Sequence, residues 1–366
     1  MWLLTGKTAF QYLINSENTS INIGYEAIQN GSLKIIESFG LSRNCIFKVE
    51  YFDGLQKKLL VLKQPNNFEP NFVSSIRNEA NFFRLLTELN IQNDLLDYDD
   101  LNSILVFESE SESEAVTTQV YQEEDKWIEF TDSVAVSLSD LHTAFHLSNK
   151  AHDYRTKYLP IFQPNLLTSE KRQALLRRIS LFENKNLRDI GKRIEQLENE
   201  IQKIEDKWNR FETIIHRDIR YSNFIYNPNS KTYKLIDFEL AAIGDSHWDL
   251  AEFIFHLIRK KESDINIEED PYLIISNLYI ISDLALMKYY DKIHKSSSTE
   301  TKAQFYKRVL QLFAIRLIEN FFIGVLNNLW EDSKINLEYK RCLAFINLLE
   351  DNKKDDFYLN YFKNER

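Results

Sequence analysis

Residues 216–223, HRDIRYSN, place an acid, an amide, two guanidinium groups and a histidine between two strand-like apolar runs. The following run, FIYN, reaches a turn at 227–230 and leads into a second strand-like run, TYKLIDFEL, which contains Asp237. A hairpin of this kind can fold Asp237 back beside the polar loop. A charged loop followed by such a hairpin limits the folds open to this chain more than any other feature does.

Asp218, Asn223 and Asp237 would then bring carboxylate and amide oxygens to one spot. Such hard donors suit Mg²⁺, which keeps several waters and takes other ligands from substrate phosphates. A further carboxylate can orient an acceptor hydroxyl, which completes the parts needed for phosphoryl transfer. Taken singly, each residue has an ordinary structural interpretation, such as a core histidine at His216. The prediction therefore depends on the three oxygen donors together.

Phosphoryl transfer also needs a cation for the nucleotide phosphates, held by a carboxylate that offsets its burial. Lys63 ends the strand-like run LLVLK, and Glu79 follows on a predicted helix containing RNEANFF. Each residue alone is as easily a surface charge. Together, and in this order, they indicate a kinase-type nucleotide site.

The N-terminal part of the chain has a mixed α and β pattern. Asp53-Gly54 between apolar runs is a hairpin signal. Helical spacing of Ile76, Ala80, Phe83 and Leu86 predicts a helix over 73–89. Apolar runs predict four strands in this part of the chain, at 33–40, 43–52, 57–65 and 101–109.

From about residue 130 onward the pattern is mostly helical. An apolar stripe from Leu187 to Trp208 fits one long helix packed on its own domain, and the alternative is a coiled-coil partner surface. The most apolar long stretch, 272–290, is interrupted by polar residues, which predicts a buried helix and no membrane span. The acidic segment 108–115 predicts a solvated linker, with phosphorylation or cation binding as the alternative.

Composition excludes several classes of function. The chain has 366 residues, with 45 basic and 55 acidic side chains and a net charge of −10. This balance argues against a nucleic-acid partner and is compatible with a cationic small-molecule acceptor. Cys45 and Cys342 form no zinc or disulfide pattern, and the N-terminus shows no signal peptide, so a cytoplasmic location is expected. The motifs GxxxxGK[ST], GxGxxG, GxSxG and HExxH are absent.

The stretches HRDIRYSN and LIDFELAAIGDSHWDLAEF resemble the aminoglycoside phosphotransferase and choline kinase group of the protein-kinase-like superfamily. The order D-x-x-x-x-N, I-D-F-E and G-D-x-x-x-D-L-A is typical of that group. The resemblance runs from about residue 39 to residue 253. It implies an α+β, two-lobed, protein-kinase-like fold. The nucleotide-binding lobe, 1–107, would be a small antiparallel sheet with one helix, and the catalytic and acceptor-binding lobe, 108–366, would be mainly helical.

The resemblance also implies roles for the catalytic residues. Asp218 would accept or orient the proton of the acceptor hydroxyl, and Arg220 would stabilise charge on the transferring phosphoryl group. Asn223 and Asp237 would hold Mg²⁺ on the nucleotide phosphates. Asp249, in the GDxxxDLA motif with Asp245, would support the catalytic loop from behind.

The nucleotide, ATP or GTP in its place, would be bound by the N-terminal lobe. Lys63, held by Glu79, would contact its α- and β-phosphates. A loop at 39–47 would cover the phosphates, and a hinge around Val106 to Glu108 would offer backbone groups to adenine. The residues implied in this loop and hinge are Gly40, Ser42, Val106 and Glu108.

Some features depart from the group pattern. The phosphate loop has a single glycine, Gly40, and the His-Arg-Asp sequence with Arg220 is closer to protein kinases. The sequence DFE replaces DFG, no APE follows, and the distance from Asp237 to Trp248 leaves no room for a long activation loop. These last features favour the small-molecule group, in which Glu239 is a candidate to face the acceptor.

The resulting prediction is an ATP-dependent phosphotransferase acting on a hydroxyl of an aminoglycoside, an amino alcohol, a sugar or a hydroxy amino acid. One alternative is a kinase of Ser or Thr in a peptide or protein. The other is a nucleotide-binding pseudokinase scaffold, although every polar position of the expected site is filled. The oligomeric state and the identity of the acceptor are left open.

Overall fold

The computed structural model describes residues 3–18, 23, 34–39, 43–52, 55, 57–109, 114–116, 123–146, 158–208, 212–260, 285–293 and 301–349. The chain divides into two compact units, each discontinuous in sequence. Unit 1 comprises Met1–Val116, His152–Pro160 and Phe224–Ala241, and unit 2 comprises Thr117–Ala151, Ile161–Asn223 and Ala242–Arg366. The hairpin that carries Asp237 therefore groups with the N-terminal sheet, whereas the sequence-based division at residue 107 placed it in the C-terminal lobe.

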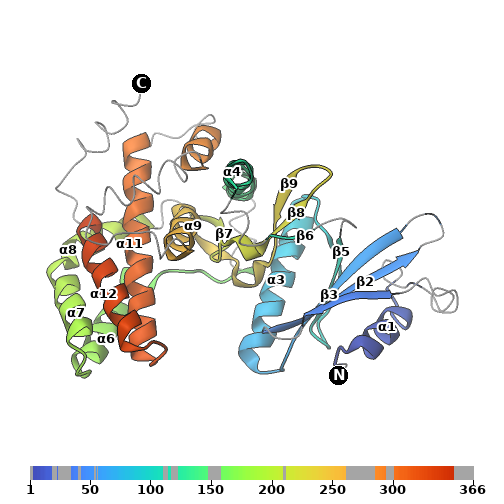
Figure 1. The fold of residues 1–366 in the computed structure, drawn as a ribbon, viewed down its shortest axis with the longest axis horizontal. Coiled ribbons are helices and arrows are strands. Elements are labelled where there is room, and N and C mark those ends of the chain that lie inside the picture. Colours follow the sequence, from blue (N-terminus) through green and yellow to red (C-terminus); the bar gives the residue numbers. More distant parts are fainter. Residues whose placement is uncertain are drawn as a thin grey trace. The chain divides into compact units, whose positions relative to one another are not determined.

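Unit 1 is built on an antiparallel sheet with the strand order β1-β2-β3-β5-β4 (Figure 1). The strands are β1 (Lys34–Phe39), β2 (Asn44–Phe52), β3 (Lys57–Pro65), β4 (Leu95–Asp99) and β5 (Ile104–Ser109). Four of these strands confirm the sequence prediction. The fifth, β4, was not predicted, because its sequence LLDYD mixes acids and apolar residues and all five side chains are half-buried.

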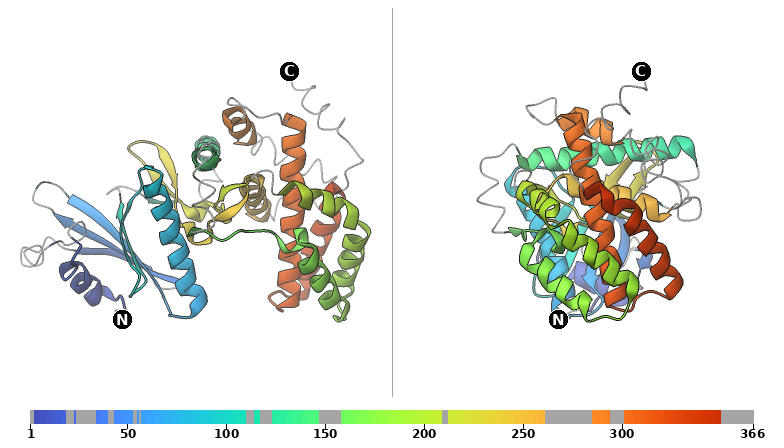
Figure 2. Two further views of the ribbon diagram at one scale, coloured as in Figure 1. Left: turned by 180° about the vertical axis from the view of Figure 1, so that it is seen from behind. Right: turned by 90° about the vertical axis from the view of Figure 1, so that its left-hand side faces the viewer.

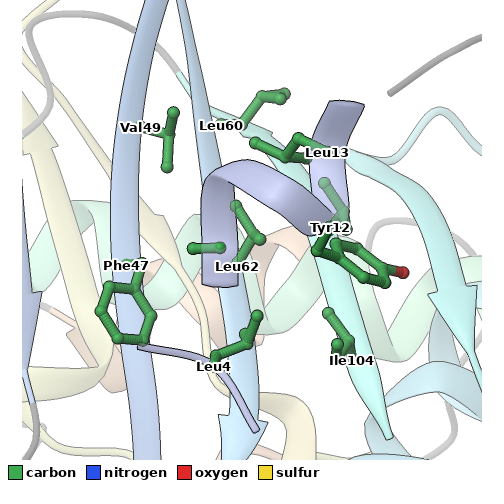
Figure 3. Close-up of a cluster of buried hydrophobic side chains, with 10 residues drawn as sticks. Leu4, Tyr12, Leu13, Phe47, Val49, Leu60, Leu62 and Ile104 are labelled. Carbon is green, nitrogen blue, oxygen red and sulfur yellow. The ribbon is translucent and has the colours of Figure 1, made fainter. Parts of the chain in front are cut away.

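Two helices cover opposite faces of this sheet. Because successive strand residues point to opposite faces, Ile104 and Val106 of β5 pack in the cluster under α1 (Gly6–Ile14), while Leu105 packs with α3 (Pro70–Glu88). Figure 3 shows Leu13 of α1 among the buried side chains of the sheet. The helix prediction over 73–89 is confirmed by α3. The sequence prediction missed α1, which Thr5 begins with a capping box.

The predicted hairpin is also confirmed in unit 1. β8 (Phe224–Asn227) pairs with β9 (Thr232–Leu235) across the expected turn, and β6 (Glu114–Ala115) adds a third short strand. A short 3₁₀ helix, η4 (Phe238–Leu240), follows directly after Asp237. The end of the hairpin thus leads straight into the DFE sequence.

Unit 2 is mainly helical and also contains a two-stranded antiparallel sheet of β7 (Glu212–Ile215) and β10 (Ala242–Asp245). α11 contacts both α9 and α12, and α7 lies against α6 and α12 (Figure 2). The helices are α4 (Glu124–His146), α6 (Ser169–Ser180), α7 (Lys185–Gln196), α8 (Glu198–Trp208), α9 (His247–Lys260), α11 (Lys302–Leu326) and α12 (Asp332–Phe345), with 3₁₀ turns η2 (Asn165–Leu167), η3 (Tyr221–Asn223) and η5 (Ile346–Leu349).

The prediction of one long helix from Leu187 to Trp208 was wrong in one respect. α7 ends at a cap on Leu197, with φ −94° and ψ 10°, and α8 begins at the next residue. The apolar stripe is nevertheless buried within unit 2, as its members Ile190 and Ile204 show. The stripe therefore packs on its own unit and does not form a free coiled-coil surface.

Among the described residues, α11 is the helix that is long and apolar enough to cross a membrane. The residues of its most apolar window are 83% buried inside the structure, which is the behaviour of a core helix. Most of the stretch predicted as a buried helix, 272–290, lies outside the described residues. Of its last residues, Ala285, Leu286 and Tyr289 are buried as expected.

Candidate active site

In unit 1, Lys63, Glu79 and Asp237 come together around one ammonium group. Lys63 Nζ lies 2.6 Å from Glu79 Oε2 and also donates to Asp237 Oδ1. The side chains of Lys63 and Glu79 are 7% and 3% exposed, whereas that of Asp237 is 26% exposed. The predicted lysine and glutamate therefore form a buried ion pair. Asp237, the predicted metal ligand in this unit, binds the same ammonium group.

The charges of this cluster depend on one another. Burial alone would lower the pKa of Lys63, but the negative charges of Glu79, Asp237 and Glu239 more than offset it, so the pKa is raised. Burial raises the pKa of Glu79, and Lys63 opposes this shift. Lys63 is consequently a fixed cation at neutral pH. A phosphate group brought to this lysine would meet a charge that is already in position.

Helix α3 holds the segment that contains Asp237. Asn78 Nδ2 donates to the carbonyls of Glu239 and Ala241 at 3.0 and 2.8 Å, and Glu79 Oε1 accepts from the backbone N–H of Phe238 at 3.3 Å. The ring of Phe238 stacks on Phe82 of the same helix, with centroids 4.0 Å apart. These contacts explain why this segment groups with unit 1.

Asp237 itself has a left-handed backbone, with φ 68° and ψ 60°. This region is uncommon for residues other than glycine, although aspartate tolerates it better than most. Such a conformation persists only where the surroundings fix it, and the α3 contacts with the next residues do so. The strain therefore marks Asp237 as a residue whose direction is specified by the fold.

The predicted phosphate loop is only partly described, because Gly40 and Ser42 lie outside the described residues. Next to them, Asn44 Nδ2 donates to Glu239 Oε2 at 3.0 Å, and Arg43 Nη1 lies 3.7 Å from Glu239 Oε1. The side chain of Glu239 is 10% exposed. Glu239, expected as a candidate to face the acceptor, is thus held by Asn44, the first residue of β2, and by Arg43 just before it.

The two predicted hinge residues lie within β5. Val106 is fully buried and pairs with both Leu62 and Asp97, and the backbone N–H of Glu108 donates to the carbonyl of Asp94 at 2.9 Å. That donor is therefore already engaged. A cavity of about 330 Å³ adjoins the end of this strand and is lined partly by Glu108, Ser109 and Ile225.

In unit 2, the predicted catalytic loop brings Asp218, Arg220 and Asn223 together. Asn223 Nδ2 donates to both Oδ2 and the backbone carbonyl of Asp218, at 2.9 and 2.8 Å. Arg220 Nη2 lies 3.0 Å from the same carboxylate oxygen, and Arg220 Nε donates to Asn223 Oδ1 at 3.4 Å. Asp218 Oδ2 is thus occupied, which leaves Oδ1 as the oxygen available for chemistry.

Asp249 supports this loop, as predicted. Its two carboxylate oxygens accept from the backbone N–H groups of His216 and Arg217, both at 2.8 Å, and His142 Nε2 lies 3.1 Å away. Asp249 is fully buried. Arg217 has a left-handed backbone with φ 70°, and its guanidinium lies 3.7 Å from the centre of the Phe162 ring. Asp249 thereby fixes a strained turn directly before Asp218.

Asp245, the other acid of the GDxxxDLA motif, has a structural environment. Arg308 donates to Asp245 Oδ2 from Nε and Nη2 at 2.9 and 2.7 Å, and His247 Nδ1 lies 2.7 Å from Oδ1. Burial alone would raise the pKa of Asp245, but Arg308 and His247 outweigh it, so the pKa is lowered. The acid is therefore an anchor between α9 and α11.

Two residues that the sequence reasoning missed also lie beside Asp218. His256 Nε2 is 3.7 Å from Asp218 Oδ1 and 3.6 Å from Glu252 Oε2. Glu252 Oε1 accepts from Arg316 Nε of α11 at 2.5 Å. Glu252 and His256 follow Asp249 on one face of α9, so helical spacing from the motif was the signal that could have found them.

Comparisons with known proteins identify the family of this chain. The model of the phosphotransferase enzyme family (APH) matches residues 50–269, which is more than half of the chain. No curated protein sequence matches the chain.

Three examples illustrate the solved structures that share its fold. A choline/ethanolamine kinase family protein from Mesorhizobium loti has 12% identity and a TM-score of 0.54, covering 93% of this chain and 94% of that one. An ethanolamine kinase from Plasmodium vivax has 14% identity and a TM-score of 0.53, with coverages of 94% and 95%. Aminoglycoside 2′-phosphotransferase-IIIa, in a GDP complex, has 15% identity and a TM-score of 0.52, with coverages of 94% and 99%.

At these identities the likeness concerns the fold, and it confirms the predicted α+β, protein-kinase-like fold. The family match covers both the Lys63 cluster and the Asp218 cluster. The chain therefore belongs to the phosphotransferase enzyme family, and the predicted enzyme class, a phosphotransferase (kinase) with an alcohol group as acceptor, is confirmed.

Proposed function

We propose that the chain transfers the γ-phosphate of ATP to a hydroxyl group of a small molecule, with Mg²⁺ as cofactor. The observation that carries this proposal is the buried Lys63 ammonium, fixed between Glu79 and Asp237. A lysine buried to this extent needs partners that offset its loss of hydration, and Glu79 and Asp237 are those partners. A lysine held in place by a glutamate is the group that contacts the nucleotide phosphates in kinase-type phosphoryl transfer.

In the proposed reaction, Asp218 Oδ1 takes the proton of the acceptor hydroxyl. The acceptor oxygen forms a bond to the γ-phosphorus, the bond from that phosphorus to the oxygen of ADP breaks, and ADP leaves with the electron pair. Arg220, which lies 3.0 Å from Asp218, can stabilise the negative charge of the transferring group. Asn223 keeps the catalytic carboxylate in place.

The metal proposal rests on the chemistry of the donor atoms. Asn223 offers an amide oxygen and Asp237 a carboxylate, and both are hard donors of the kind that Mg²⁺ selects. Among the described residues, no group of three or more His, Cys, Asp or Glu side chains could hold a metal ion. A cation bound through few protein ligands is what Mg²⁺ with substrate phosphates requires, and when bound it would neutralise phosphate charge.

The remaining parts of the proposal follow from the sequence and the family. Val106 and Glu108 are the proposed hinge, Gly40 and Ser42 belong to the proposed phosphate loop, and GTP is the alternative nucleotide. Membership of the phosphotransferase enzyme family supports a small-molecule acceptor over a peptide. The candidate acceptors are an aminoglycoside, an amino alcohol, a sugar and a hydroxy amino acid, and the proposed location is the cytoplasm.

A transfer assay tests this function. The purified protein is incubated with Mg²⁺, γ-labelled ATP or GTP, and kanamycin, choline, ethanolamine, glucose, homoserine or a Ser/Thr peptide. We expect label in one small alcohol, and a loss of about 10²–10⁴-fold in the Asp218→Asn variant, because the base is removed. Asp206→Asn, an exposed acid of α8, is the matched control and should transfer normally.

The outcomes separate the alternatives. Label in the peptide would support the protein-kinase alternative, and nucleotide binding without transfer or hydrolysis would support the pseudokinase. Full transfer by Asp218→Asn would contradict the assignment of the base.

A further inference from the structure

Two polar atoms of helix α9 near the Asp218 carboxylate have no hydrogen-bond partner among the described residues. They are Glu252 Oε2 and His256 Nε2, and both atoms are buried. The Glu252 side chain is 3% exposed, and the His256 side chain is 22% exposed. Leaving a buried donor unpaired is costly, so the unpaired His256 Nε2 beside Asp218 calls for a ligand that accepts its hydrogen bond.

The spacing of these atoms fits one bridging oxygen. His256 Nε2 lies 3.7 Å from Asp218 Oδ1 and 3.6 Å from Glu252 Oε2, and both distances are too long for a direct hydrogen bond. An oxygen placed between either pair of atoms could lie at about 2.8 Å from both, which is an ordinary hydrogen-bond length. Asp218 Oδ1 is also the carboxylate oxygen that Arg220 and Asn223 leave available.

We propose that His256, supported by Glu252, binds the acceptor hydroxyl beside Asp218 and sets its position for phosphoryl transfer. This inference rests on the proposed function. The acceptor oxygen gives its proton to Asp218 Oδ1 and accepts a hydrogen bond from His256 Nε2–H. One lone pair is then held by the imidazole, and another remains for attack on the γ-phosphorus. The bonds formed and broken are those of the transfer described above.

The electrostatics of the site agree with a neutral imidazole in this role. Burial lowers the pKa of His256, and Arg316, Arg220 and Arg259 lower it further. The carboxylates of Asp218 and Glu252 act in the opposite direction. Burial raises the pKa of Glu252 to about 7, with Arg316 opposing the rise. A neutral histidine can donate from Nε2 without competing with the acceptor for the base.

Glu252 has a second function in this arrangement. Its Oε1 binds Arg316, whose guanidinium lies 4.3 Å from the centre of the Phe255 ring. This pair ties α9 to α11 one turn before His256. The ion pair therefore steadies the turn of α9 from which His256 projects, and Glu252 Oε2 lies 3.6 Å from His256 Nε2.

The experiment compares His256→Leu and His256→Gln with the wild type and with Asp218→Asn. Leucine removes the donor, and the glutamine amide can restore a donor near the position of Nε2. The measurements are kcat and KM for an alcohol that the wild type phosphorylates, the Kd of Mg·ATP, and the hydrolysis of γ-labelled ATP with water as acceptor. The thermal unfolding midpoint of each variant shows whether it is folded.

We expect His256→Leu to lower kcat/KM for the alcohol about 10- to 30-fold, the loss expected for one hydrogen bond to the reacting group. The Kd of Mg·ATP should change less than about twofold, and His256→Gln should recover most of the loss. A folded His256→Leu variant with wild-type kcat/KM would overturn the proposal. Equal loss in the leucine and glutamine variants would reduce His256 to a packing role and would overturn it too.

The design keeps this inference distinct from the proposed function. If Asp218→Asn loses transfer and His256→Leu does not, only the inference about His256 fails. If the wild type neither phosphorylates an alcohol nor hydrolyses ATP, the proposed function fails, and the inference fails with it.

Discussion

Glu252 shows how a single buried residue can make the stability of the protein depend on pH. Its carboxyl is 3% exposed, and burial raises its pKa from 4.5 to about 7 even though Arg316 binds it. An acid with a raised pKa binds its proton more tightly in the folded state than in the unfolded state. Its contribution to stability is therefore fully present below pH 4.5 and is lost as the pH rises through about 7.

We predict that this one group makes the free energy of unfolding fall by roughly 2–3 kcal/mol between pH 5 and pH 8. Urea denaturation of Glu252→Gln should show a flatter pH profile than the wild type, because the amide does not titrate. Glu170→Gln, an exposed acid in the first turn of α6, is the control and should keep the wild-type slope. Equal slopes in all three proteins would refute the prediction.

The site residues differ in how far the sequence could predict them. Asp218, Asn223 and Asp237 lie in short local motifs, so their spacing alone made them candidates. The ion pair of Lys63 and Glu79 could be predicted only because phosphoryl transfer requires a supported cation. Helical spacing from Asp249 could have singled out His256 as well, but its nearness to Asp218 depends on where α9 docks against the loop 216–223.

At the scale of elements, side chains of α3 hold the segment that follows Asp237. Asn78 donates to two carbonyls of the 239–241 segment, while Asn81, on the same helix, donates to the carbonyl of Tyr158 at 3.1 Å. The two asparagines make the same kind of bond, but only Asn78 acts on the residues that follow Asp237. They therefore form a matched pair of test positions.

We predict that Asn78→Ala and Asn81→Ala each lower the free energy of unfolding by about 1 kcal/mol, since each loses a side-chain hydrogen bond. Only Asn78→Ala should also weaken Mg·ATP binding, by about tenfold, because the left-handed turn at Asp237 loses its support. Calorimetric titration measures both affinities. Equal affinities in the two variants would show that α3 does not set the direction of Asp237.

The helical elements also show what periodicity can and cannot define. The stripe from Leu187 to Trp208 correctly predicted which side chains are buried, because burial follows the apolar spacing. It did not predict the break at Leu197, because the spacing continues across the cap with little change.

Helix α1 was missed for a different reason. It is short, and its packing depends on the face of the sheet that contains Leu60 and Leu62.

At the scale of the whole molecule, the chain joins distant sequence segments into each unit. Residues 224–241 belong to unit 1, although they lie far along the sequence from its sheet. The core under α1 consists of residues from the N-terminal part of the chain, from Leu4 to Val106. A cavity made in that core should therefore weaken the hairpin of 224–241 more than it weakens the helices of unit 2.

We predict this result for Leu13→Ala, which removes a fully buried side chain of α1 and should cost about 2–5 kcal/mol. Hydrogen exchange followed by mass spectrometry should show faster exchange in β3, β8 and β9, with α11 nearly unchanged. Leu3→Ala is the matched control, because Leu3 is 52% exposed and its truncation should leave exchange unaltered. If α11 lost protection as much as β9, the two units would unfold as one cooperative body. Contacts within unit 1 would then not be enough to explain the stability of that unit.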